Sequence, residues 1–211
     1  MKLIKGGVKL IRDQAVAHVE AVEILLRNEI LVGFPEQNAD REPEDSHLSG
    51  PNGPTNAALG YIHDHGAPEA NIPARPFMDP GIQSTRDDLA GQFRSLLEKV
   101  THVGGIPPTQ VAQRLHRIGL VASVGIKNKI NEGIPPPLAE STLLKRANRG
   151  LKGRKGAQKE LQNRAKGEAP STQFAKPLVD TGQLRNAVNY VIRPSRPGKV
   201  TKLAKPSTKK V

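Results

Sequence analysis

The stretch "TQVAQRLHRIGLVASVGIKNKINEG", residues 109–133, carries the clearest helical pattern in the chain. Apolar residues recur in it at spacings of three and four, which predicts a helix whose buried stripe comprises Val111, Leu115, Ile118, Ala122 and Ile126. Gly119 and Gly125 each cost about 1 kcal/mol of helix stability relative to alanine. Both glycines are tolerable where another helix or another chain packs closely against this helix.

The segments before this helix predict two further helices and two strands. Residues 4–28 have the pattern of a long helix, with an apolar stripe of Ile4, Val8, Ile11, Ala15, Val19, Val22 and Leu26. The segment "EILVGF" (29–34) follows as a strand that Pro35 ends. Alternation in "NAALGYIHDHG" (56–66) predicts another strand. A helix is then expected to begin with Asp79 as its N-cap and Pro80 in its first position, and to run to about residue 100.

The segments after the helix are more irregular. Residues 134–150 begin as an extended proline segment and become a short helix, and the basic stretch that follows is expected to be weakly ordered. Residues 180–182 predict a turn, followed by a last strand whose apolar positions are Leu184, Val188, Tyr190 and Ile192.

Together these elements predict an α+β fold, in which a small antiparallel or mixed sheet packs against two to three helices, with long loops and a basic C-terminal arm. We expect a single domain over residues 1–193, with loop insertions at 35–55 and 145–170, and a basic tail over 194–211. Aromatic residues make up only 3% of the 211 residues, so the core is aliphatic and modest.

The charge of the chain is uneven. Its net charge is +12, and two segments, 145–166 and 193–210, hold half of the 32 lysines and arginines, whereas 35–46 is acidic. This distribution favours contact with an acidic partner or with nucleic acid through local segments. Without cysteine the chain has no disulfide or thiolate site. We expect a soluble protein with no signal peptide and no membrane contact.

Two short motifs raise the question of catalysis. "HDH" (63–65) would place two histidines on one face of a strand, but a zinc site needs at least one further ligand. "DTG" (180–182) matches the active-site tripeptide of aspartic proteases, which need two carboxylates sharing a proton. A homodimer can supply the second carboxylate, but the chain is rich in predicted helices and the tripeptide opens directly into "QLRNAV". We therefore expect no enzyme, no cofactor and no metal, with Asp180 serving as a turn or helix cap.

Three segments together carry a family resemblance. "ALGYIHDHGAP", "NIPARPF" and "PLVDTGQLRNAV", in this order after a long N-terminal helix, resemble the tailed-bacteriophage virion morphogenesis and tail-completion proteins. The resemblance spans residues 1–193, and "IPARPF" and "LVDTGQLRNAV" are its specific parts. It implies a structural virion protein of the neck that forms a ring, commonly hexameric, through which DNA passes.

The resemblance also implies partners and locations. The neighbours would be other copies of the chain and the phage connector, terminator or tail-tube proteins, in the virion neck or tail and in the host cytoplasm during assembly. Within phages, a tail terminator or a collar protein is the alternative, and a basic nucleic-acid-binding protein without sequence specificity is the alternative outside them. A ring subunit buries much of its surface against neighbours, which fits the modest core.

Two sets of residues follow as candidate sites. The motifs supply structural or interfacial residues, namely Pro73, Arg75, Pro76, Phe77, Asp180, Thr181, Gly182, Leu184 and Arg185. Among them we expect Phe77 and Leu184 to anchor their segments in the core, and Arg75 to pair with Asp180. The basic stretch supplies candidate contacts to DNA or to an acidic partner, namely Lys145, Arg146, Arg149, Lys152, Arg154 and Lys155.

Overall fold

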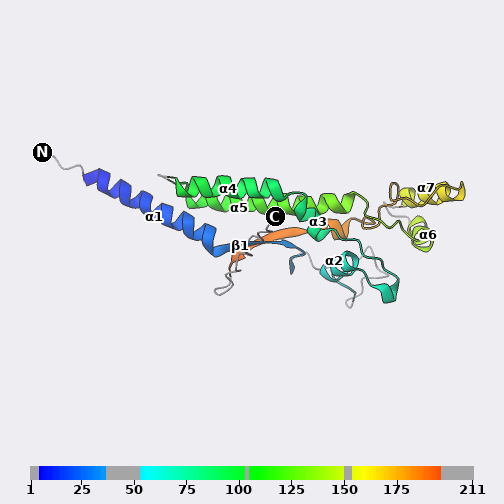
Figure 1. Cartoon of the computed structure of the whole chain (residues 1–211). Coiled ribbons are helices and arrows are strands. Elements are labelled where there is room, and N and C mark those ends of the chain that lie inside the picture. The colour runs from blue at the N-terminus through cyan, green and yellow to red at the C-terminus, as the bar shows by residue number, and fades with distance from the viewer. Residues whose placement is uncertain (1–4, 37–52, 103–104, 150–153, 196–211) are drawn as a thin grey trace, which may run out of the picture.

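The central element of the fold is the long helix α5 (Pro108–Asn131), which the other elements flank (Figure 1). The computed structural model describes residues 5–36, 53–102, 105–149 and 154–195, with side chains described from residue 15 onward. All five residues of the predicted stripe are buried, so the helix and its inner face are confirmed. Helix α5 contacts α1 (Lys5–Arg27), α3 (Met78–Gln83), α4 (Arg86–Thr101) and the strands.

The two glycines of α5 lie where neighbours approach the helix most closely. A Cβ added at Gly125 would lie 2.5 Å from the carbonyl oxygen of Gly81 in α3, and a Cβ at Gly119 would lie 2.3 Å from the ring of Tyr190. Real Cβ atoms do not approach other atoms this closely. The expectation of close packing at these glycines is therefore confirmed, with a helix at one position and an aromatic side chain at the other.

The sheet consists of two antiparallel strands in the described part of the chain. Strand β1 (Asn28–Gly33) pairs with β2 (Asn189–Pro194), with Ile30 opposite Ile192. A small antiparallel sheet packed against helices agrees with the prediction, and the α+β class is confirmed. The last strand begins later than expected, because Leu184 belongs to a short helix, α8 (Gln183–Ala187), that precedes β2.

The expected strand at 56–66 is wrong, because this segment forms helix α2 (Asn56–His65). The hydroxyl of Thr55 accepts a hydrogen bond from the Ala58 N–H at 3.2 Å and so caps its first turn. Asn56 and Gly60 are buried one helical turn apart while Ala58 between them is exposed, which is a helical pattern, because a strand would place all three on one face. The ring of Phe34 occupies the space beside Gly60, where a Cβ would lie 2.3 Å from it.

The predicted helix from Asp79 to about residue 100 is two helices, α3 and α4, that meet at Ser84 and Thr85. Both hydroxyls donate to carbonyls three residues back, Ser84 to Gly81 at 2.8 Å and Thr85 to Ile82 at 3.0 Å, and such bonds compete with helix continuation. Helix α3 begins at Met78, so Asp79 is not its N-cap and Pro80 is not its first residue.

The basic stretch after residue 144 is more ordered than expected. Helix α6 (Glu140–Asn148) and helix α7 (Arg154–Ala165) pack on each other at one end of the molecule (Figure 1). Their apolar side chains share a small cluster with Leu138 and Ala175, and those side chains are Leu143, Ala147, Ala157 and Leu161. Residues 37–52 of the acidic loop, 150–153 and 196–211 of the basic tail lie outside the described residues.

Two larger apolar clusters lie on α5. One surrounds its second half and contains Phe77, Ile126 and Leu184, so both expected anchors are buried there. The other surrounds its first half and contains Leu115 with Ala21 of α1 and Leu96 of α4. The first cluster contains residues of both sequence motifs, so the candidate site lies at this end of α5.

Candidate functional site

Arg75, in the middle of the "IPARPF" motif, connects this motif to α2 and to the proline segment that begins at residue 134. Its side chain is buried, with 5% of the residue exposed, and donates to the carbonyl oxygen of Pro136 through Nε at 3.2 Å and Nη2 at 2.8 Å. Its backbone N–H donates to the carbonyl oxygen of His63 at 2.8 Å. Pro73 and Pro76 are exposed on either side. The motif is therefore a connector that is fixed between α2 and the proline segment.

The "HDH" residues serve the same connector. Asp64 Oδ1 accepts hydrogen bonds from the backbone N–H groups of Phe77 at 2.7 Å and Met78 at 3.0 Å. These N–H groups open α3 and lack partners within that helix, so the carboxylate caps it from α2. His65 contacts Tyr61, one turn back in the same helix. No group of three metal-ligating side chains occurs among the described residues.

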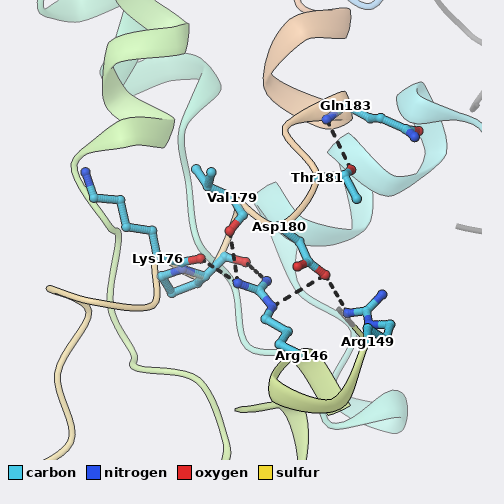
Figure 2. Close-up of polar contacts among 8 residues, drawn as sticks. Arg146, Arg149, Lys176, Val179, Asp180, Thr181 and Gln183 are labelled. Carbon is cyan, nitrogen blue, oxygen red and sulfur yellow. Dashed lines mark hydrogen bonds and ion pairs between the residues drawn. The ribbon is translucent and has the colours of Figure 1, made fainter. Parts of the chain in front are cut away.

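Arg146 is the centre of a second junction, shown in Figure 2. It lies on α6 with 8% of the residue exposed, and its guanidinium donates to three backbone carbonyl oxygens: Nη1 to Lys176 at 2.9 Å and Val179 at 3.0 Å, and Nη2 to Pro177 at 2.8 Å. Burial lowers the pKa of Arg146, and the charge of Asp180 raises it. Arg146 thus has a structural role, and its predicted contact with DNA or an acidic partner would require the buried guanidinium to leave these carbonyl oxygens.

Asp180 pairs with Arg146 of α6 and with Arg149, the residue directly after this helix. Its Oδ2 lies 2.5 Å from Arg149 Nη2 and 3.6 Å from Arg146 Nε (Figure 2). The expected helix-cap role of Asp180 is wrong, because α8 has Gly182 as its N-cap and its first N–H, that of Gln183, donates to the hydroxyl of Thr181. The expected pair of Arg75 with Asp180 is also wrong, since Arg75 bonds to Pro136 and Asp180 pairs with Arg146 and Arg149.

The remaining motif residues position α8. Gly182 has φ +88°, a left-handed conformation that favours glycine, and the hydroxyl of Thr181 accepts a 3.4 Å bond from the Gln183 N–H. Arg185 donates to the side-chain oxygen of Asn131 at the end of α5, at 3.2 Å. Leu184 is buried beside Phe77 in the same cluster. The two motifs, a hundred residues apart, therefore meet through the core rather than through a salt bridge.

The junction holds more positive than negative charge. Arg146 and Arg149 share a single carboxylate, Asp180, and Arg75 adds a third guanidinium group, whose hydrogen bonds go to the carbonyl oxygen of Pro136. Burial lowers the pKa of Arg75, and the charge of Arg146 lowers it further, which places the two guanidinium groups within electrostatic reach of each other. Because arginine stays charged at any ordinary pH, this junction stabilises the fold only while the carbonyl acceptors and Asp180 remain in place.

The six residues predicted to contact DNA divide into two groups. Arg146 and Arg149 are engaged in the junction, whereas Lys145, Arg154 and Lys155 are exposed on α6 and α7. Lys152 lies outside the described residues. A lysine that the sequence did not single out, Lys159, has its ammonium 4.1 Å from the centre of the Phe174 ring. Of the predicted contacts, those that the structure leaves accessible therefore lie on the outer side of α6 and α7.

An apolar face of α1 is exposed, which the sequence did not indicate. Val19 and Leu26 are 58% and 72% exposed, and Val16 and Ala15 are exposed beside them. Ala21, Ile24 and Leu25, on the other side of the helix, contact the core. Of the predicted stripe residues whose side chains the structure describes, Ala15, Val19 and Leu26 therefore lie on the outer face, whereas Val22 packs on the core. In Figure 1, α1 also projects beyond the ends of α4 and α5.

No protein-family model, curated protein or solved structure matches this chain. The resemblance to phage tail-completion proteins therefore rests on the sequence motifs alone. Among the described helices, none combines the length and apolar character needed to cross a membrane.

Proposed function

We propose that this chain is a structural subunit of the head–tail junction of a tailed bacteriophage. Copies of it form a ring, with six as the expected number, that joins the connector to the tail and lets DNA pass. The proposal assigns no catalytic role to the chain, because its motif residues serve as connectors and anchors. A terminator or collar position in the same neck remains the alternative within this class.

The exposed apolar face of α1 is the observation that carries the proposal. Three of its large side chains, Val16, Val19 and Leu26, are each more than half exposed. Covering one side chain of this size contributes about 1.5–3 kcal/mol, so leaving all three in water is costly for an isolated chain. Exposed apolar patches of this kind mark protein interfaces. A protein that works in several copies covers such a face with its neighbours.

The assembly is tested on the purified full chain. Light scattering and negative-stain images are expected to give closed rings, and Val19→Glu is expected to shift the protein to monomers while circular dichroism stays unchanged. Gln162→Glu, a change on α7 at the other end of the molecule, serves as the matched control. In the phage that encodes the chain, its deletion is expected to leave heads and tails unjoined. A stable monomer together with normal joining overturns the proposal.

Contact with DNA is the second candidate function, and the exposed cations of α6 and α7 favour it. Lys145, Arg154 and Lys155 are exposed, and among the described residues their side chains form no ion pair and no hydrogen bond. Such cations bind phosphates without reading sequence, and binding then weakens with salt. This contact is compatible with a ring whose lumen carries DNA.

The DNA contact is tested by the salt dependence of binding. Replacing Lys145, Arg154 and Lys155 by glutamine is expected to reduce the slope of log K against log salt by roughly 0.9 for each phosphate that the chain no longer neutralises. Lys99→Gln, at an exposed position of α4, is the matched control. An unchanged slope in the triple variant rules these residues out as the DNA contact and leaves the ring proposal standing.

A further inference from the structure

A second exposed apolar patch lies on α5, on the side facing away from the core. Leu120 and Val124 are one turn apart and are 53% and 42% exposed. Successive helix residues are rotated by about 100°, so Leu120 points nearly opposite to Ile118 and Ala122 of the buried stripe. Helix α1 packs on that buried side, through Ala21. The free faces of α1 and α5 therefore lie on opposite sides of the packed helices.

The two patches carry opposite charges at their borders. Glu20 and Glu23 flank the exposed face of α1, and Arg117 and Lys127 flank Leu120 and Val124 on α5. Glu23 forms a pair with Arg27 at 3.1 Å. Among the described residues, Glu20, Arg117 and Lys127 form no ion pair. The charges left over are thus acidic on α1 and basic on α5.

Charge decides which pairing of these faces is favourable. If two α1 faces met, Glu20 and Glu23 of one copy would repel the same carboxylates of the other copy. If two α5 faces met, Arg117 and Lys127 would repel the same cations of the other copy. An α1 face against an α5 face instead covers apolar residues on both sides and places carboxylates next to cations. Such a contact joins two different surfaces, and repetition of it generates a ring when the rotation closes.

We propose that the exposed face of α1 in one copy docks on the outer face of α5 in the next copy. Val19 and Leu26 cover Leu120 and Val124, and Glu20 and Glu23 lie beside Arg117 and Lys127. The occupant of the α5 patch is thus a second copy of this chain. This inference rests on the proposed self-assembly and adds to it the two surfaces that form each contact.

Mixing two broken chains tests the pairing. Val19→Glu removes the α1 face and Leu120→Glu removes the α5 face, and each is expected to weaken assembly by about 100-fold or more and leave monomers. An equimolar mixture retains one intact pair of faces, the α1 face of the Leu120→Glu chain and the α5 face of the Val19→Glu chain. Light scattering is expected to find a 1:1 dimer that grows no further.

The outcomes separate this inference from the proposed function. If Leu120→Glu assembles like the wild type while Val19→Glu does not, self-assembly stands and the α5 patch is wrong. Dimers of Leu120→Glu alone mean that α1 pairs with α1, which also overturns the inference. Two monomeric variants that fail to combine exclude a direct contact between the faces. If the wild type itself stays monomeric, the proposed function fails as well.

The lack of cysteine allows a direct test in the wild-type background. A chain with both Val19→Cys and Leu120→Cys is expected to form disulfide-linked multimers on oxidation, and the longest product reports the number of subunits. Either change alone is expected to give no cross-linked product, because each contact then holds one thiol. Gln162→Cys paired with Val19→Cys is the control. Cross-linked dimers from Val19→Cys alone contradict the proposed pairing.

Discussion

Replacing Gly125 by alanine tests whether α3 and α5 cross at backbone distance. In an unobstructed helix this change stabilises the protein by about 1 kcal/mol. At Gly125 the new methyl group would lie 2.5 Å from the carbonyl oxygen of Gly81 and 2.6 Å from the side chain of Thr85. The carbonyl belongs to the main chain of α3, so no side-chain rotation relieves the contact. The two helices have to separate instead.

The size of the effect follows from these two opposing contributions. Overpacking of this kind costs typically about 1–3 kcal/mol, and the upper end applies because backbone must move. Subtracting the gain in helix propensity of about 1 kcal/mol leaves a net loss of about 2 kcal/mol in the free energy of unfolding. For a chain of this length, each kcal/mol shifts Tm by roughly 2–4 °C, so a fall of about 4–8 °C is expected.

Two further glycine changes serve as internal standards for the assay, which is urea denaturation followed by circular dichroism. Gly91 lies on the exposed side of α4 with no atom within 4 Å of a new Cβ, so Gly91→Ala is expected to stabilise by about 1 kcal/mol. Gly119→Ala meets the ring of Tyr190, a side chain that is able to shift, and is expected to fall between the two. If Gly125→Ala stabilises the chain as Gly91→Ala does, the close crossing of α3 and α5 is refuted.

Three further changes test the junctions and the core. Asp180→Asn is expected to cost about 1.5–3 kcal/mol of unfolding free energy, because it removes the carboxylate that pairs with Arg146 and Arg149, and unchanged urea denaturation contradicts this. Burial works to raise the pKa of Glu160, but hydrogen bonds from Ser171 and Arg164 outweigh it and hold the pKa below its ordinary value of 4.5. The stability that Glu160 contributes is therefore present above pH 4.5 and lost as the pH falls through the lower pKa of the folded state. Glu160→Gln is expected to make the free energy of unfolding less dependent on pH in this acidic range. If the variant and the wild type lose stability with the same slope against pH, this explanation is wrong. Phe77→Ala is expected to cost about 3–5 kcal/mol in thermal or urea unfolding, and a loss below about 1 kcal/mol means that Phe77 is not an anchor.

The parts of the fold that the sequence could predict are those whose signal is local. The stripe on α5 is buried as expected, because five apolar residues at helical spacing define one side of the helix that has to face the core. The strand predicted at 56–66 is wrong because its short alternating pattern also satisfies a helix with one buried side. Two features decide for the helix. The Thr55 cap is a signal that the sequence contains, whereas the Phe34 ring beside Gly60 is a contact that only the folded chain supplies.

The site is harder to predict because its contacts involve the main chain. Arg75 and Asp180 are the charged residues of the two motifs, which suggests a pair, yet Arg75 donates to a backbone carbonyl. Carbonyl acceptors exist at every residue and leave no mark in a sequence. On α1, the periodicity shows that an apolar stripe exists, but it does not say whether the cover comes from the same chain or from another.

The hydrogen bonds of Arg146 influence which substitutions are tolerated in the segment after Phe174. The guanidinium holds residues 176, 177 and 179 through their carbonyl oxygens and not through their side chains. One side chain thereby does what a paired strand would do for an irregular segment. The side chain at 179 is therefore free to vary as far as this contact is concerned, whereas lysine in place of Arg146 would lack the planar fork that reaches three acceptors. In related chains we then expect the arginine at position 146 to be kept, while the side chains of the residues whose carbonyl oxygens it binds vary.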